Sequence, residues 1–227
     1  MPDSGLAETA AMATVPGRSR RVREAYTAWS ATYDLDRNLT RDLDGEVTRE
    51  ILGARHARCA LEIGCGTGKN TVWLAERSAY LLALDLSPGM VQRARQKVTA
   101  PHVDFALADL TQGLPCSAQR FDLITCNLVL EHIDRLDPVF AQAARCLTAD
   151  GLLLVSELHP FRQYQGAQAR FTDASACTVG VPAFAHHVSD FLAAATQAGL
   201  RLLRFREWWH RDDTARPPRL ATFEFQR

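Results

Sequence analysis

The glycine-rich stretch at residues 61–71 reads Leu61-Glu62-Ile63-Gly64-Cys65-Gly66-Thr67-Gly68-Lys69-Asn70-Thr71. An apolar run leads directly into three glycines at alternate positions, and a longer amphipathic segment follows. Glycines at such a turn permit tight backbone conformations and leave room for a ligand against the main chain. The spacing is G-x-G-x-G, whereas dinucleotide-binding loops have G-x-G-x-x-G. The stretch therefore predicts a strand, a ligand-binding turn and a helix.

On both sides of this turn, short apolar runs alternate with longer amphipathic stretches, a pattern typical of βαβ units. The first five runs are apolar along most of their length, as in a parallel sheet covered by helices on both faces. The last two runs are too close in sequence for a helical crossover, which predicts an antiparallel hairpin. The expected strands are residues 59–63, 80–84, 103–107, 121–126, 151–157, 200–208 and 221–226, and the expected helices are 21–33, 41–55, 69–77, 88–97, 137–147 and 188–198.

The balance of charged residues limits the kinds of binding partner that the chain can attract. Lys plus Arg number 26 and Asp plus Glu number 26, so no whole-chain field attracts nucleic acid or an anionic membrane. We therefore expect a small-molecule partner, with no nucleic acid and no membrane. The six cysteines show no C-x-x-C spacing, and neither a signal-peptide core nor a membrane-spanning run is evident. A cytoplasmic location and no metal site are the resulting expectations.

Further motifs follow the glycine turn in order. Asp85 closes the second expected strand, roughly 20 positions after Gly64, where an acid can accept hydrogen bonds from ribose hydroxyls. Ser87 and Pro88 then form a helix start. After the third strand, Asp109 beside Leu110 can accept a bond from an adenine amino group and cover the ring edge. The fourth motif spans residues 121–132 and the fifth spans 147–155.

In this combination the sequence closely resembles the class I methyltransferases that depend on S-adenosylmethionine (SAM). Within them it resembles the small-molecule enzymes related to the ubiquinone and menaquinone biosynthesis methyltransferases, from about Tyr26 to the C-terminus. The resemblance implies an α/β fold: a Rossmann-like, seven-stranded, mostly parallel sheet with an antiparallel C-terminal hairpin, helices on both faces and an N-terminal helical lid. It divides the chain into a disordered N-terminus (1–20) and one domain (21–227), made of a lid (21–57), a SAM-binding core (58–157), an acceptor-site insertion (158–187) and a C-terminal helix and hairpin (188–227).

The resemblance also assigns contacts to the cofactor SAM. The glycines would lie under its methionine part, Asp85 would hold the ribose, and Asp109 would accept from the adenine amine. His132 matches a histidine common in the family motif, and we interpret it as a packing residue. The expected cofactor-binding residues are Tyr33, Arg41, Gly64, Gly66, Gly68, Asp85, Leu86, Met90, Asp109, Leu110 and Asn127.

The acceptor is expected beyond the carboxyl ends of the strands, between the lid and the insertion. If the methylated group is a hydroxyl or a protonated amine, a base assists, and histidine is the usual choice. The candidate bases are His159, His186 and His187, and the candidate substrate contacts are Tyr26, Trp29, Arg162, Tyr164 and Arg170.

These features favour methyl transfer to an O or N atom of a small metabolite, by a monomer or a homodimer. Two alternatives stay open. A catalytically silent SAM-binding partner protein would have the same cofactor site, and only turnover separates the two. A nicotinamide-dependent oxidoreductase is disfavoured by the glycine spacing and by the absence of a Tyr-x-x-x-Lys pair.

Overall fold

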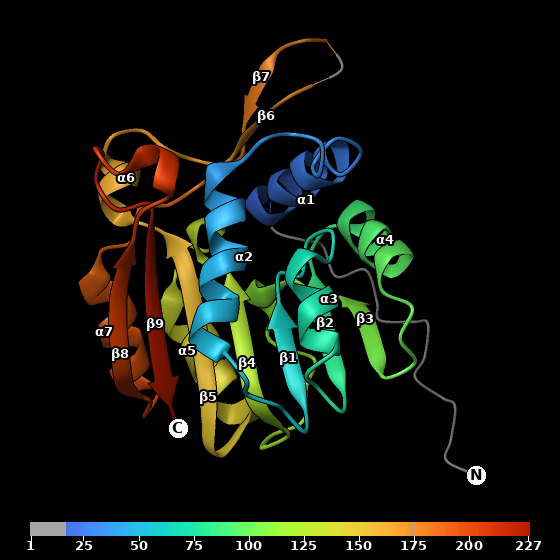
Figure 1. Cartoon of the computed structure of the whole chain (residues 1–227), viewed down its shortest axis with the longest axis vertical. Helices are drawn as coiled ribbons and strands as arrows, with labels where there is room; N and C mark the ends of the chain where they lie inside the picture. Colours follow the sequence, from blue (N-terminus) through green and yellow to red (C-terminus); the bar gives the residue numbers. More distant parts are fainter. Residues whose placement is uncertain (1–16, 174) are drawn as a thin grey trace.

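A seven-stranded sheet forms the centre of the protein (Figure 1). The computed structural model describes residues 17–173 and 175–227. Strands β1 to β5 are parallel in the spatial order β3-β2-β1-β4-β5, and β9 lies antiparallel between β5 and β8. The predicted mostly parallel sheet with a C-terminal antiparallel hairpin is thus confirmed. The strands are β1 (Ala60–Ile63), β2 (Leu81–Asp85), β3 (Val103–Leu107), β4 (Phe121–Asn127), β5 (Leu147–Leu158), β8 (Arg201–Trp208) and β9 (Leu220–Gln226).

Helices cover both faces of the sheet, because the central strands are apolar on both sides. Phe121 and Ile124 of β4 are fully buried, and Phe140 packs edge-to-face on Phe225 of β9, with ring centroids 5.7 Å apart. The glycine turn lies between β1 and the first of the sheet-covering helices that follow it. One face carries α2 (Leu39–Leu52), α3 (Lys69–Ala75) and α4 (Pro88–Lys97), and the other carries α5 (Leu136–Cys146) and α7 (Val188–Gln197).

The lid differs from its expected bounds. Helix α1 (Gly17–Trp29) already includes residues 17–20, which the sequence placed in the disordered N-terminus; residues 1–16 of that segment lie outside the described residues. Val22 and Trp29 are buried, so apolar packing defines the helix. Helix α2 ends at Leu52, where Gly53 takes a φ of 52°. Across the described residues, no helix has the length and apolar character needed to cross a membrane.

The insertion at 158–187 is more regular than its sequence predicts. It contains α6 (Pro160–Tyr164) and a hairpin of β6 (Arg170–Thr172) and β7 (Thr178–Gly180). The sequence analysis expected no strand here, because three-residue strands are too short to show an alternating pattern. Phe171 of the hairpin stacks on Trp29 of α1 at 5.3 Å between ring centroids. The hairpin therefore packs against the lid (Figure 1).

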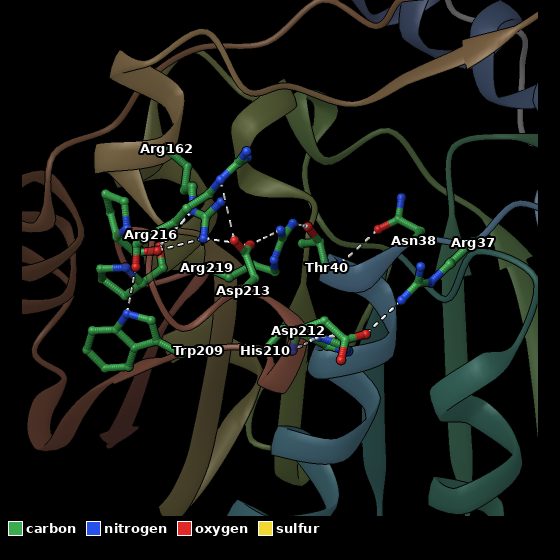
Figure 2. A network of polar contacts seen from close by, with 12 residues as sticks. Arg37, Asn38, Thr40, Arg162, Trp209, His210, Asp212, Asp213, Arg216 and Arg219 are labelled. Carbon is green, nitrogen blue, oxygen red and sulfur yellow. Dashed lines mark hydrogen bonds and ion pairs between the residues drawn. The ribbon is translucent and has the colours of Figure 1, made fainter.

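A buried ionic network fixes the start of α2 (Figure 2). The Asp213 carboxylate lies in the loop between β8 and β9 and accepts from Arg162 at 2.8 Å and from Arg219. Arg219 also donates to the Thr40 hydroxyl at 3.0 Å, and Arg162 donates to the Pro217 carbonyl at 2.7 Å. The network thus ties α6 and the β8–β9 loop to the first turn of α2.

We expect Asp213→Asn to lower the free energy of unfolding by about 2 kcal/mol at neutral pH, because an amide replaces the carboxylate between two guanidinium groups. Burial alone raises the pKa of Asp213, but hydrogen bonds and charges from Arg219 and Arg162 outweigh it and hold the pKa below its ordinary value of 3.8. A carboxylate with a lowered folded-state pKa stabilises the fold above its ordinary pKa. This contribution is lost as the pH falls below 3.8.

Urea unfolding at about pH 7 and about pH 3 measures this effect, and the gap between wild type and Asp213→Asn should narrow at the lower pH. The matched control is Asp212→Asn, because Asp212 pairs with Arg37 at the surface. Its cost should stay below about 0.5 kcal/mol. Equal costs for the two variants would contradict a stabilising role for the buried network.

Candidate active site

A cavity of about 390 Å³ lies where β1, β2 and β4 end, beneath α1 and the start of α2. This is the edge at which open α/β sheets bind ligands. The residues expected to contact the cofactor line it, with the exception of Gly68. They are Tyr33, Arg41, Gly64, Gly66, Asp85, Leu86, Met90, Asp109, Leu110 and Asn127. Gly68 instead is the N-cap residue just before α3, where its φ is 86° and a Cβ would lie 3.2 Å from the Ala94 Cα.

The glycine turn forms the floor of the cavity. Gly64 and Gly66 have φ values of 75° and 53°, in the left-handed region that L residues avoid. A Cβ on Gly64 would lie 2.0 Å from Cγ2 of Val129, whereas one on Gly66 would meet no described atom within 4 Å. Gly64 is therefore required for packing, and Gly66 leaves open space on the side of the cavity.

The carboxylate of Asp85 organises the turn at the end of β2. It accepts from the main-chain N–H of Gly66 at 2.8 Å and from that of Ser87 at 2.8 Å. Burial raises the pKa of Asp85, and these main-chain bonds oppose the rise. Because the side chain also lines the cavity, its remaining lone pairs can accept bonds from a ligand.

Asp109 presents an unsatisfied acceptor. Its Oδ1 accepts from the N–H of Thr111 at 2.9 Å and caps the 3-10 helix η1 (Leu110–Gln112). Its Oδ2 is buried and has no hydrogen-bond partner among the described residues. An unpaired buried carboxylate oxygen is costly, so the site has the chemistry to accept a bond from a ligand N–H.

The segment between α1 and α2 closes the cavity from above. Arg41 donates to the main-chain oxygens of Tyr33 and Asp36, and its guanidinium lies 3.9 Å from the centroid of the Tyr33 ring. Asp34 accepts from Thr67 at 2.7 Å and from Lys97 at 2.6 Å. These contacts join the lid to the glycine turn and to α4.

A polar cluster that sequence reasoning missed lies on the buried face of α2. Buried Asp44 accepts from the amides of Asn127 at 2.8 Å and Asn70 at 2.9 Å, and Asn127 also donates to Thr48 at 2.8 Å. Asn127, one of the expected cofactor contacts, thus holds this cluster with its side chain. The sequence pattern could have indicated this cluster. Asp44 and Thr48 are one helical turn apart, and each follows an apolar residue of the buried face, Leu43 or Val47.

Two further buried carboxyl groups surround the glycine turn. Glu62 accepts from the Thr71 hydroxyl at 2.5 Å and lines the cavity. Glu157 accepts from the main-chain N–H of Val129 at 2.9 Å and that of Leu130 at 2.8 Å. Burial is the main cause that raises the pKa of each group to about 8. Both are therefore expected to be largely protonated at neutral pH.

The histidine that lines the cavity is His132, not one of the three candidate bases. It belongs to the 3-10 helix η2 (Leu130–His132), which follows β4. Its Nε2 lies 2.8 Å from the Tyr26 hydroxyl and its Nδ1 lies 2.7 Å from the Pro182 carbonyl oxygen. His132, which the sequence suggested as a packing residue, thus lies in the cavity lining and is bonded through both ring nitrogens. Tyr26, an expected substrate contact, lines the cavity as well.

The three candidate bases lie outside the residues that line the cavity. His159 is buried and caps α6, with Nε2 2.8 Å from Glu207 Oε1. His186 is buried against the Ile133 carbonyl at 2.7 Å. His187 is exposed and caps α7. The structure therefore places none of the three at the cavity; His159 and His187 stand at helix starts, and His186 is bonded to the segment after η2.

Four of the expected substrate contacts also lie outside the lining. Trp29 is buried against Phe171, and Arg162 is held in the Asp213 network. Tyr164 and Arg170 are exposed on α6 and β6. The insertion was expected to supply three of these contacts, but their side chains serve packing or face solvent. No arrangement of three or more His, Cys, Asp or Glu side chains in residues 17–173 and 175–227 is suited to hold a metal ion.

Comparison with known proteins agrees with this geometry. The methyltransferase domain family matches residues 61–155. An uncharacterized methyltransferase of Emericella nidulans is 31% identical over 220 residues, which cover 79% of this chain and 76% of that protein. The malonyl-[acyl-carrier protein] O-methyltransferase of Hahella chejuensis is 32% identical over 147 residues, 61% of this chain and only 50% of the relative.

Among solved structures, the N-methyltransferase NodS from Bradyrhizobium japonicum, in complex with S-adenosylhomocysteine (SAH), has a TM-score of 0.68 at 20% identity, covering 92% of this chain and 98% of NodS. At this identity the likeness establishes the fold. The sequence relatives, the matched domain and the glycine-lined cavity together establish the family. The chain belongs to the class I SAM-dependent methyltransferases.

Proposed function

We propose that the chain transfers the methyl group of SAM to an oxygen or nitrogen atom of a small-molecule acceptor inside this cavity. The observation that carries the proposal is the cavity itself, about 390 Å³ and lined by both lid and core residues. Small-molecule sites commonly range from about 300 to 1,000 Å³. The cavity volume is near the lower end of this range, and it must hold both the cofactor and the acceptor, so a compact acceptor is favoured.

The residues present fit SAM. The open space above Gly66 admits a ligand against the main chain, and the Asp85 carboxylate has lone pairs left for ribose hydroxyls. The unpartnered Oδ2 of Asp109 matches the N–H donor of an adenine amino group. Leu86, Met90 and Leu110 supply apolar surface for the ring.

When bound, SAM would supply a methyl group attached to a sulfonium sulfur, and the acceptor atom would displace that sulfur from the methyl carbon in line. The chain must then hold the acceptor close to that carbon and exclude water. Val22 of α1 and Ile133 after η2 give the lining apolar surface beside Tyr26 and His132. The lid contacts of Asp34 with Thr67 and Lys97 close the site over its ligands.

The relatives support O or N as the methylated atom without deciding between them, since the names of one solved and one curated relative specify N- and O-methylation. The chain spans about half the length of the malonyl-[acyl-carrier protein] O-methyltransferase that it matches. A catalytically silent SAM-binding protein remains the competing proposal. Release of SAH in the presence of hydroxyl and amine probes supports catalysis, whereas SAH binding without turnover of any probe supports the silent alternative.

We expect Asp109→Asn to weaken SAH binding by roughly 10-fold, about 1.4 kcal/mol. The asparagine Oδ1 can still accept from Thr111 and cap η1, but an NH₂ group replaces the unpartnered Oδ2. Two donors would then face each other where the adenine amine binds. Titration calorimetry gives the affinity, and thermal unfolding of the ligand-free variant should stay within about 2 °C of wild type. Unchanged affinity would show that Asp109 does not contact the adenine.

A further inference from the structure

The side chains of Tyr26 and His132 meet inside the cavity. The Tyr26 hydroxyl lies 2.8 Å from Nε2 of His132. The two rings are edge-to-face with centroids 5.3 Å apart, and the His132 side chain is only 7% exposed. The pair therefore joins the lid helix α1 to the segment after β4, at a place where both residues line the cavity.

The other ring nitrogen fixes the position of the His132 proton. Nδ1 lies 2.7 Å from the Pro182 carbonyl oxygen, which can only accept a hydrogen bond. The neutral ring therefore carries its proton on Nδ1 and presents a lone pair at Nε2. The Tyr26 hydroxyl must donate to that lone pair, which leaves the lone pairs of the Tyr26 oxygen to accept a bond from another group.

An acidic side chain lies beside the His132 ring. Glu131 Oε1 lies 3.8 Å from Nε2. Burial first, and then the charges of Tyr33 and Glu131, raise the pKa of Tyr26 well above its ordinary value of 10.0. Tyr26 thus keeps its proton at neutral pH. The acidic groups that act on the pair come from the lid, β2, η2 and β5 and are Tyr33, Asp85, Glu131 and Glu157.

We propose that Tyr26 and His132 form the proton relay for the acceptor, an inference that rests on the proposed methyl transfer. The acceptor group X–H, with X oxygen or nitrogen, donates to the Tyr26 oxygen. As the bond between X and the methyl carbon forms, the sulfur–methyl bond breaks and its electron pair stays on sulfur. The X–H bond breaks, its proton passes to Tyr26, and the Tyr26 proton passes to Nε2 of His132. The positive charge of the sulfonium ends on the His132 ring, beside Glu131.

This relay defines the acceptor class. An acceptor with a hydroxyl or an N–H group has a proton to give to Tyr26, whereas a carboxylate or a thioether has none. The relay therefore selects hydroxyl or N–H acceptors.

The first arm of the test needs no acceptor. Proton–nitrogen spectra of SAH-bound protein with labelled histidine rings should show His132 protonated on Nδ1. Tyr26→Phe should move the Nε2 resonance toward that of an unbonded ring nitrogen. His186 is the internal control, because it is buried, is bonded to the Ile133 carbonyl and does not itself line the cavity, and its resonances should not move. A proton on Nε2 of His132, or no response to Tyr26→Phe, would overturn the relay.

The second arm measures SAH release with a phenol, a primary amine and a carboxylic acid as probes. At saturating SAM, kcat for the phenol or amine should fall about 100-fold in His132→Gln and at least about 10-fold in Tyr26→Phe. The Kd for SAH should change by less than about 3-fold. His186→Gln is the matched control and should retain wild-type kcat. Turnover of the carboxylic acid alone, equally fast in His132→Gln, would overturn the relay; wild-type protein that fails to bind SAH would instead contradict the proposed function.

Discussion

Gly64→Ala is expected to lower the free energy of unfolding by about 4 kcal/mol, the largest loss for any single methyl group added at the cavity. Two costs combine. A φ of 75° is unfavourable for alanine, and the new Cβ would lie 2.0 Å from Cγ2 of Val129. The backbone at Gly64 cannot shift easily, because the N–H groups of Gly64 and Cys65 both donate to the Leu84 carbonyl, at 2.8 and 2.9 Å. Urea unfolding followed by circular dichroism measures the loss.

Two control variants separate the costs. Gly199→Ala has a similar φ of 73° but open space around the added Cβ, so it should cost only about 1 kcal/mol. The double variant Gly64→Ala with Val129→Ala removes the clash and should be more stable than Gly64→Ala alone. If Gly64→Ala costs no more than Gly199→Ala, close packing against Val129 does not explain the glycine.

Asp85→Ala is expected to weaken SAH binding by about 100-fold, close to 2.7 kcal/mol. The variant removes a carboxylate that faces the cavity and the acceptor that holds the Gly66 and Ser87 N–H groups in place. Both the ligand bonds and the shape of the glycine turn are therefore affected. Titration calorimetry gives the affinity.

Asp122→Ala provides the matched control for Asp85. The Asp122 carboxylate also accepts from two main-chain N–H groups, those of Arg58 at 2.8 Å and Cys59 at 3.0 Å, but it does not line the cavity. It should lower stability to a similar degree while SAH affinity stays within about 3-fold of wild type. Equal losses of affinity in the two variants would mean that Asp85 acts only through the fold.

The sheet and the cofactor side of the cavity could be predicted because their signals are local. The apolar runs determine the strands, and Ser87 with Pro88 begins α4 as predicted. The glycine turn and Asp85 follow their strands directly, so their positions at the sheet edge depend only on the order of the elements. Ten of the eleven expected cofactor contacts line the cavity for this reason.

The acceptor side could not be predicted in the same way, because it depends on contacts between distant segments. Tyr26 and His132 are 106 positions apart, and nothing in either local pattern indicates that they meet. His159, His186 and His187 resemble bases in sequence, yet none lines the cavity, and each is bonded to its own turn or to a neighbouring segment. The insertion supplies a main-chain oxygen, that of Pro182, where side chains were expected.

Titration calorimetry of SAH into the wild-type chain tests most directly whether the cavity beneath α1 is a SAM site. We predict one site per chain with micromolar affinity and no comparable binding of a nicotinamide dinucleotide. Folded wild-type protein that shows no heat of binding with SAH, or that prefers the dinucleotide, would contradict the assignment of the cavity.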